Sequence, residues 1–243
     1  MEVQIAVSKV RKYATSTSGD TVEVIERPNG GVSVVMADGQ SSGKGAKWVS
    51  SFVVRKVIAL LAEGVRDGAA ARAAADALFT ERNGKVSATL NILSADLMSN
   101  TLVCTRNNPA PILLARDEEI KILDEESEPI GFHRNTRPVI TQVELKPGLT
   151  VVIFTDGITH AGSRDGRSLD AVTCLQSTLE NEEPSPQFVA DTLLLHALKL
   201  DQGRPVDDIS VVALRVISTP ESDDSFGSRN LIRRMTVRLP LSP

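Results

Sequence analysis

The sequence has few aromatic residues and few cysteines. Only 3% of its 243 residues are aromatic, and no basic stripe accompanies them, which argues against a surface that stacks on nucleic-acid bases. The two cysteines, Cys104 and Cys174, lie far apart in apolar runs, so the sequence indicates neither a disulfide framework nor a paired metal-binding motif. We expect two buried thiols in a reducing compartment.

Long apolar runs and a strong net charge are also missing. No window approaches the roughly 18 apolar residues of a membrane span, and the first 13 residues lack the apolar stretch of a signal peptide. The 27 Lys and Arg nearly balance the 31 Asp and Glu, and 41% of the residues are hydrophobic, as in compact globular proteins. We therefore expect a cytoplasmic protein that binds neither nucleic acid nor membrane, with its oligomeric state left open.

Strand patterns outnumber helix patterns, and the helix patterns come in two pairs. Helices are predicted over 45–64, 67–82, 168–179 and 185–200. Strands are predicted over 22–26, 32–37, 86–94, 101–106, 112–115, 120–123, 139–145, 149–155 and 209–217. This order predicts an α+β fold with a central antiparallel β-sandwich flanked by helix pairs, a four-layer αββα arrangement.

The last residues differ in composition from the rest. Residues 1–217 are predicted to form one domain, and residues 218–243 a polar linker followed by an Arg-rich C-terminal tail. Alternation of apolar and polar residues in 229–243 is compatible with a strand that docks on a sheet edge, and equally with a loosely ordered terminus.

Aspartates stand next to apolar strand runs at several places. Asp38 and Asp156 each follow such a run, Asp207 and Asp208 precede the last one, and Asp20 ends a polar turn before the first predicted strand. A carboxylate beside an apolar run needs either solvent or a cation, because burying it unpaired is costly. Turn chemistry explains each acid separately, but their number together favours a shared site.

Convergence of Asp20, Asp38, Asp156 and Asp207 would raise their pKa values and destabilise the fold unless cations neutralised them. Two divalent ions would balance four carboxylates. Donors that are all oxygen match hard ions such as Mg²⁺ or Mn²⁺ and argue against zinc. Two such ions about 3.5–4 Å apart polarise a bridging water and clamp phosphoryl oxygens, which suits phosphoester hydrolysis.

The acidic motifs resemble those of the metal-dependent protein phosphatase (PPM) family. They are Gly19-Asp20, Asp38-Gly39 with Gly43 and Ala46, Thr155-Asp156-Gly157-Ile158, and Asp207-Asp208-Ile209-Ser210. Their order is most similar to the bacterial sporulation and stress-response (SpoIIE-type) serine/threonine phosphatases, in particular to stand-alone members. The resemblance covers roughly residues 7–216. It implies a β-sandwich between helix pairs and a metal-dependent phosphatase domain over 1–217.

The resemblance also implies roles for individual residues. Asp38 would bridge two metal ions, Mn²⁺ or Mg²⁺, and the carbonyl of Gly39 would bind one of them. Asp20 would bind the second ion, and Asp156 and Asp207 the first. The catalytic residues would thus be Asp38, Asp156 and Asp207, acting through a metal-bridging water that attacks phosphorus in line.

The sequence departs from the motif of that branch in one loop. The branch usually has Asp-Gly-Met-Gly-His-Gly, and here Gln40, Ser41 and Ser42 replace the Met, Gly and His. Asp208 is interpreted as a residue that supports the ligands without binding an ion itself.

A phosphate-holding cation and an acid for the leaving group are less clearly indicated. Arg11, Lys12 or Lys44 could supply the charge that an Arg supplies in eukaryotic relatives, although each is also an ordinary surface cation. His160, just after Thr155-Asp156-Gly157-Ile158, could be a general acid or an uninvolved loop residue, and His133 and His196 offer less.

The sequence therefore predicts a phosphoprotein phosphatase that hydrolyses phosphoserine or phosphothreonine on a bacterial signalling partner. By analogy, that partner would be of the anti-anti-sigma or stressosome type. The alternative is a catalytically silent module of the same fold that docks a regulatory partner through the 40–46 loop and the tail. An aspartyl-phosphate mechanism is set aside, because Asp156-Gly157-Ile158 lacks the second acid that it requires.

Overall fold

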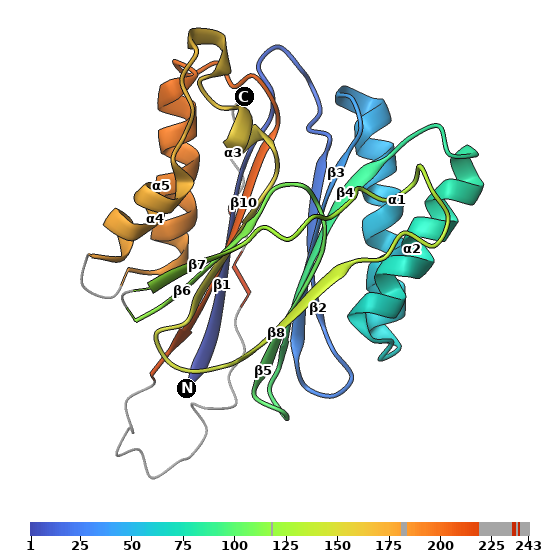
Figure 1. Cartoon of the computed structure of the whole chain (residues 1–243), viewed down its shortest axis with the longest axis horizontal. Coiled ribbons are helices and arrows are strands. Elements are labelled where there is room, and N and C mark those ends of the chain that lie inside the picture. The colour runs from blue at the N-terminus through green and yellow to red at the C-terminus, as the bar shows by residue number, and fades with distance from the viewer. Residues whose placement is uncertain (118, 181–183, 219–234, 237, 239–243) are drawn as a thin grey trace.

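The computed structural model describes residues 1–117, 119–180, 184–218, 235, 236 and 238. Its described strands form two five-stranded antiparallel sheets, packed face to face (Figure 1). One sheet has the order β1 (Glu2–Val10), β10 (Ile209–Ile217), β9 (Thr150–Phe154), β6 (Ile112–Arg116), β7 (Glu119–Leu123). The other has the order β2 (Asp20–Glu26), β3 (Val32–Gly39), β4 (Ala88–Asp96), β5 (Thr101–Asn107), β8 (Val139–Glu144).

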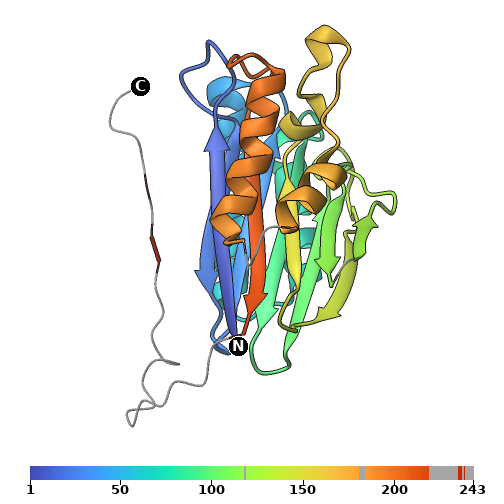
Figure 2. The same ribbon diagram turned by 90° about the vertical axis from the view of Figure 1, so that its left-hand side faces the viewer.

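A pair of helices covers the outer face of each sheet (Figure 1). They are α1 (Gly43–Ala62) and α2 (Asp67–Arg82) on one side, and α4 (Ala171–Leu179) and α5 (Pro186–Leu200) on the other. Figure 2 shows α5 running along β1 and β10. The predicted α+β sandwich with a helix pair on each face is confirmed.

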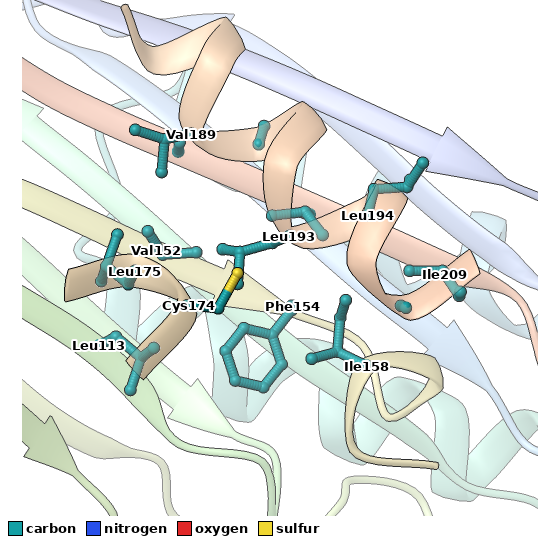
Figure 3. Close-up of a cluster of buried hydrophobic side chains, with 14 of the residues drawn as sticks. Leu113, Val152, Phe154, Ile158, Cys174, Leu175, Val189, Leu193, Leu194 and Ile209 are labelled. Atoms are coloured by element: carbon teal, nitrogen blue, oxygen red, sulfur yellow. The ribbon is translucent and has the colours of Figure 1, made fainter. Parts of the chain in front are cut away.

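Three apolar cores lie between the two sheets and the two helix pairs. The first lies between α1–α2 and their sheet, and the second lies between the sheets. The third lies under α4–α5, where Phe154 and Leu193 are both buried (Figure 3). Small side chains on α2, including Ala70 and Ala74, are fully buried. Each core is continuous, so the ends of the strands are held at fixed positions.

Local sequence signals set the helix ends. The helix predicted over 168–179 begins at Ala171, because the side chain of Asp170 accepts a hydrogen bond from the backbone N–H of Thr173 and caps it. α5 begins in the same way, with Ser185 as cap and Pro186 in the first turn.

Three elements were not predicted. β1 pairs with β10 along its whole length and forms the edge of its sheet; its Val3, Ile5 and Val7 pack against the core between the sheets. A single helical turn, α3 (Gly157–His160), and a 3-10 turn, Ser163–Asp165, follow β9. They are too short to produce a periodic pattern.

β10 ends at Ile217. Most of the predicted linker and tail lies outside the described residues, and the idea of a docking strand there stays a prediction. Within the described part of the chain, every helix is too short or too polar to cross a membrane. Cys104 and Cys174 are both buried and unpaired by disulfide.

Candidate metal centre

The four predicted acids meet at one end of the sandwich, the end where α3 lies (Figure 1). Asp20 is the first residue of β2 and pairs with Asp38 across β2 and β3. Asp156 follows β9 and Asp207 precedes β10. Because β9 and β10 are antiparallel neighbours, the last residue of β9 and the first residue of β10 lie at the same end of the sheet.

Asp20 joins the two sheets and is completely buried. It begins β2, rather than ending the turn before that strand. Its Oδ2 accepts hydrogen bonds from Thr155 Oγ1 at 3.0 Å and from Ser210 Oγ at 2.5 Å. Its Oδ1 is buried without a partner. A buried carboxylate oxygen without a donor is unfavourable, and a cation at that atom would satisfy it.

Two ammonium groups bind the backbone carbonyl of Asp20. Lys47 Nζ, from α1, donates to the Asp20 carbonyl oxygen at 2.8 Å and to Thr21 Oγ1 at 2.9 Å. Lys9 Nζ, from β1, donates to the same carbonyl at 3.2 Å. The two ammonium groups place positive charge near the carboxylate of Asp20. Neither of them binds its Oδ1, which has no hydrogen-bond partner.

Burial is the main cause of the raised pKa values at the site. Burial, with the negative charges of Asp20, Asp156 and Asp207, raises the pKa of Asp38 to about 9. Burial raises the pKa of Asp20 to about 6, against the lowering effect of the hydrogen bond from Ser210. Burial and the charge of Asp207 also raise the pKa of Asp156. Asp38 and Asp156 are therefore buried near other carboxylates, an arrangement that a cation would stabilise.

Asp208 is bound on both of its carboxylate oxygens. Oδ1 accepts from the backbone N–H of Lys12 at 2.8 Å, and Oδ2 from that of Gly19 at 2.7 Å. It is 3% exposed. Asp208 thus holds both ends of the loop between β1 and β2, which fits a supporting role better than direct binding of an ion.

Gly39 lets α1 approach the acids. A Cβ atom at Gly39 would lie 2.1 Å from the carbonyl oxygen of Ala46 on α1, a distance that no side chain can adopt. Glycine at the end of β3 is therefore required for α1 to begin where it does.

The altered loop after Gly39 is anchored by its first residue. Gln40 N–H donates to the carbonyl of Ser87 at 2.9 Å, and Gln40 Oε1 accepts from Ser87 N–H at 3.0 Å. The next residue, Ser41, has φ of 80°. This left-handed conformation favours glycine, and the related motif has glycine at that position.

Replacing Ser41 with glycine should therefore stabilise the protein. We expect Ser41→Gly to raise the free energy of unfolding by about 0.5–1 kcal/mol, because the strain at positive φ is removed. Ser42→Gly is the matched control, since Ser42 has φ of −143° and gains nothing from glycine. Urea unfolding of the three proteins measures the effect, and equal stabilisation by both variants would contradict it.

One of the three candidate phosphate-holding cations lies at the site. Lys12 Nζ is 3.9 Å from Asp207 Oδ1, whereas Arg11 and Lys44 are exposed. His160 Nδ1 lies 3.7 Å from Asp156 Oδ2, and the side chain of His160 is 54% exposed.

Some residues that shape the site were not assigned a role from the sequence. Thr155 and Ser210 stand inside the quoted motifs, but only the pairing of β9 with β10 brings both hydroxyls to Asp20. Asn108 binds the end of β9 through Nδ2 and the carbonyl of Phe154 at 3.4 Å, and its Oδ1 accepts from Ala110 N–H at 2.9 Å. It thereby fixes the backbone just before Asp156.

Comparison with known proteins identifies the family. The family model described as Stage II sporulation protein E (SpoIIE) matches residues 28–217. The chain belongs to the SpoIIE family. The resemblance to the SpoIIE-type branch of the metal-dependent phosphatases is confirmed. Stage II sporulation protein E of Bacillus subtilis (strain 168) is 20% identical over 225 residues, which cover 87% of this chain and 27% of that protein.

Solved structures show the same fold. The PP2C phosphatase domain of Bacillus subtilis SpoIIE, with a fragment of its regulatory domain, has a TM-score of 0.77 at 21% identity, covering 90% of this chain and 64% of that one. The RsbU and RsbW domains of a Mycobacterium tuberculosis protein have a TM-score of 0.72 at 20% identity, and the match covers 90% of this chain and 61% of that one. The catalytic domain of the serine/threonine phosphatase PstP in complex with two manganese ions has a TM-score of 0.68 at 18% identity, and the match covers 89% of this chain and 99% of that one.

Proposed function

We propose that this SpoIIE-family chain is an active metal-dependent serine/threonine phosphoprotein phosphatase. The observation that carries the proposal is the convergence of Asp20, Asp38, Asp156 and Asp207, with Oδ1 of Asp20 buried and unpaired. A silent module of the same fold would have no reason to keep four acids together at one end of the sandwich with a buried carboxylate oxygen left unpaired.

The donor set fits two hard divalent ions. Asp38 would hold both ions, and the Gly39 carbonyl would bind one of them. Asp156 and Asp207 would hold the first ion, and Asp20 the second. The donors are all oxygen, as Mn²⁺ or Mg²⁺ prefers. When bound, such a pair supplies an activated water and stabilises the negative charge on the phosphoryl oxygens.

Other residues of the chain would position these groups and the substrate. The hydroxyls of Thr155 and Ser210 orient the carboxylate of Asp20, and Asp208 fixes the loop that carries Lys12. Lys12 Nζ, at the edge of the acids, would hold a phosphate oxygen. A side-chain nucleophile is not needed, so no covalent phosphoenzyme would form.

The substrate that we propose is a phosphoserine or phosphothreonine on a bacterial signalling protein. The similarity in fold to the RsbU domain and to SpoIIE supports a partner of the anti-anti-sigma or stressosome type. This part of the proposal rests on analogy of fold.

The test is turnover by the purified full chain on p-nitrophenyl phosphate and on a phosphoserine peptide with Mn²⁺. We expect EDTA to abolish turnover and Mn²⁺ to restore it. Lys12→Ala should raise KM for the phosphopeptide about tenfold, the loss of one charged contact of about 1.4 kcal/mol. Lys44→Ala, at an exposed lysine, is the matched control and should leave KM unchanged.

Two results would contradict the proposal. Turnover that survives EDTA would exclude the metal assignment. Binding of a phosphoprotein without Mn²⁺ and without release of phosphate would instead support the silent module.

A further inference from the structure

His160 is held beside Asp156 by the helical turn that separates them. α3 begins directly after Asp156, and the backbone N–H of His160 donates to the Asp156 carbonyl at 2.8 Å. Residues four positions apart on a helical turn share one face. The imidazole Nδ1 accordingly lies 3.7 Å from Asp156 Oδ2.

Asp207 completes a group of three. Ligand atoms of Asp156, His160 and Asp207 all lie within 4.8 Å of one another, and the described residues contain no other such group of three or more His, Cys, Asp or Glu. Two ligands of one ion, each about 2.2 Å from it, lie at most about 4.4 Å apart. Small movements of the side chains would therefore let one ion contact all three.

The surroundings of this trio suit entry of an ion from solvent. The side chains of Asp156 and His160 are 39% and 54% exposed, and that of Asp207 is 31% exposed. The buried, unpaired Oδ1 of Asp20, which is paired with Asp38 in the sheet, belongs to the neighbouring ion of the proposed pair.

We propose that His160 is a nitrogen ligand of the ion bound by Asp156 and Asp207, and that it directs this position toward a first-row transition ion such as Mn²⁺ rather than Mg²⁺. This inference rests on the proposed function, because it concerns the same ion. It replaces the general-acid role that the sequence left open for His160.

The chemistry of the donors supports the choice of ion. Mg²⁺ binds oxygen ligands almost exclusively. Imidazole nitrogen suits the later first-row ions best, and Mn²⁺, the first of that series, accepts it more readily than Mg²⁺ does. A site of two carboxylates and one imidazole is therefore less suited to Mg²⁺ than a site of carboxylates and carbonyls alone. Replacing His160 with an acid should reverse the preference.

Pulsed EPR on the full chain loaded with Mn²⁺ tests the ligand directly. We expect the electron spin echo of the wild type to be modulated by a nitrogen of imidazole. His160→Gln should lose this modulation. His133→Gln, which alters an exposed histidine in the loop before β8, should keep it.

Calorimetric titration with Mn²⁺ and Mg²⁺ gives a second readout. His160→Gln should lower the affinity for Mn²⁺ about tenfold, on the scale of changes that accompany a lost ligand interaction. His160→Glu should bind Mg²⁺ more tightly than the wild type. Circular dichroism of each variant establishes that it is folded.

The outcomes separate this inference from the proposed function. Binding of Mn²⁺ by the wild type without nitrogen modulation, or modulation that persists in His160→Gln, would overturn the role of His160 and leave the phosphatase proposal intact. A wild type that binds neither ion would overturn both.

Discussion

The Asp38→Asn variant is expected to lose turnover by a factor on the order of 10³ or more, while its metal-free form becomes more stable than the wild type. Asp38 is the acid whose pKa is raised to about 9 by burial and by the negative charges of three other carboxylates. The amide keeps the shape of the side chain and removes one charge from this cluster. Activity falls because the assigned bridging ligand is lost.

The gain in stability should depend on pH. A carboxyl group whose pKa is higher in the folded than in the unfolded protein stabilises the fold below its unfolded pKa, and this contribution is lost as the pH rises toward the folded pKa. For Asp38 the window runs from about 4 to about 9. In EDTA, the melting temperature of the wild type should therefore fall as the pH is raised from 5 to 8, and that of Asp38→Asn should fall less.

Differential scanning calorimetry measures both effects. At pH 8 we expect the free energy of unfolding of Asp38→Asn in EDTA to exceed that of the wild type by several kcal/mol, since each pH unit between the unfolded and folded pKa values of Asp38 lowers the stability of the wild type by up to about 1.4 kcal/mol. Mn²⁺ should reverse the order, because it stabilises only the protein that binds it. Asp124→Asn, at an exposed acid, is the control. A metal-free Asp38→Asn that melts below the wild type at pH 8 would contradict the repulsion among the acids.

The Gly39→Ala variant is expected to be unstable and to bind Mn²⁺ poorly. The added methyl group would lie 2.1 Å from the carbonyl oxygen of Ala46, so α1 or β3 must shift. Overpacking of this kind destabilises by about 1–3 kcal/mol. The same shift moves the carbonyl of Gly39 and the neighbouring Asp38, and we expect the affinity for Mn²⁺ to fall by at least about tenfold.

Gly45→Ala, in the first turn of α1, is a matched control. A Cβ atom at Gly45 meets no atom within 4 Å, and alanine is the better helix former by about 1 kcal/mol. This variant should therefore be slightly more stable than the wild type and bind Mn²⁺ as well. Thermal unfolding and calorimetric titration compare the two variants, and equal behaviour would show that the contact with Ala46 does not constrain the site.

The sandwich and its helix pairs were predictable because their patterns are long. The apolar period of α1 and the turn between β8 and β9 can each be recognised from a short stretch of sequence. The order of the elements along the chain then favours a sandwich with a helix pair on each face. β1 was missed although Val3, Ile5 and Val7 alternate, since a partly buried edge strand gives a weak signal and its pairing with β10 joins opposite ends of the domain.

The site was predictable in its acids but not in their environment. Asp38, Asp156 and Asp207 stand out because each lies beside an apolar run. The burial of Asp20 depends on hydroxyls of Thr155 and Ser210 from the other sheet, a contact between residues more than a hundred positions apart. Such a contact follows from how the sheets pack, and nothing local to Asp20 indicates it.

Anomalous diffraction from crystals soaked in Mn²⁺ would show whether the four acids form a metal centre. We expect two manganese peaks, both bound by Asp38, with one also bound by Asp20 and the other by Asp156 and Asp207. Manganese peaks elsewhere on the surface, with no peak within bonding distance of Asp38, would show that these four acids do not form a metal centre.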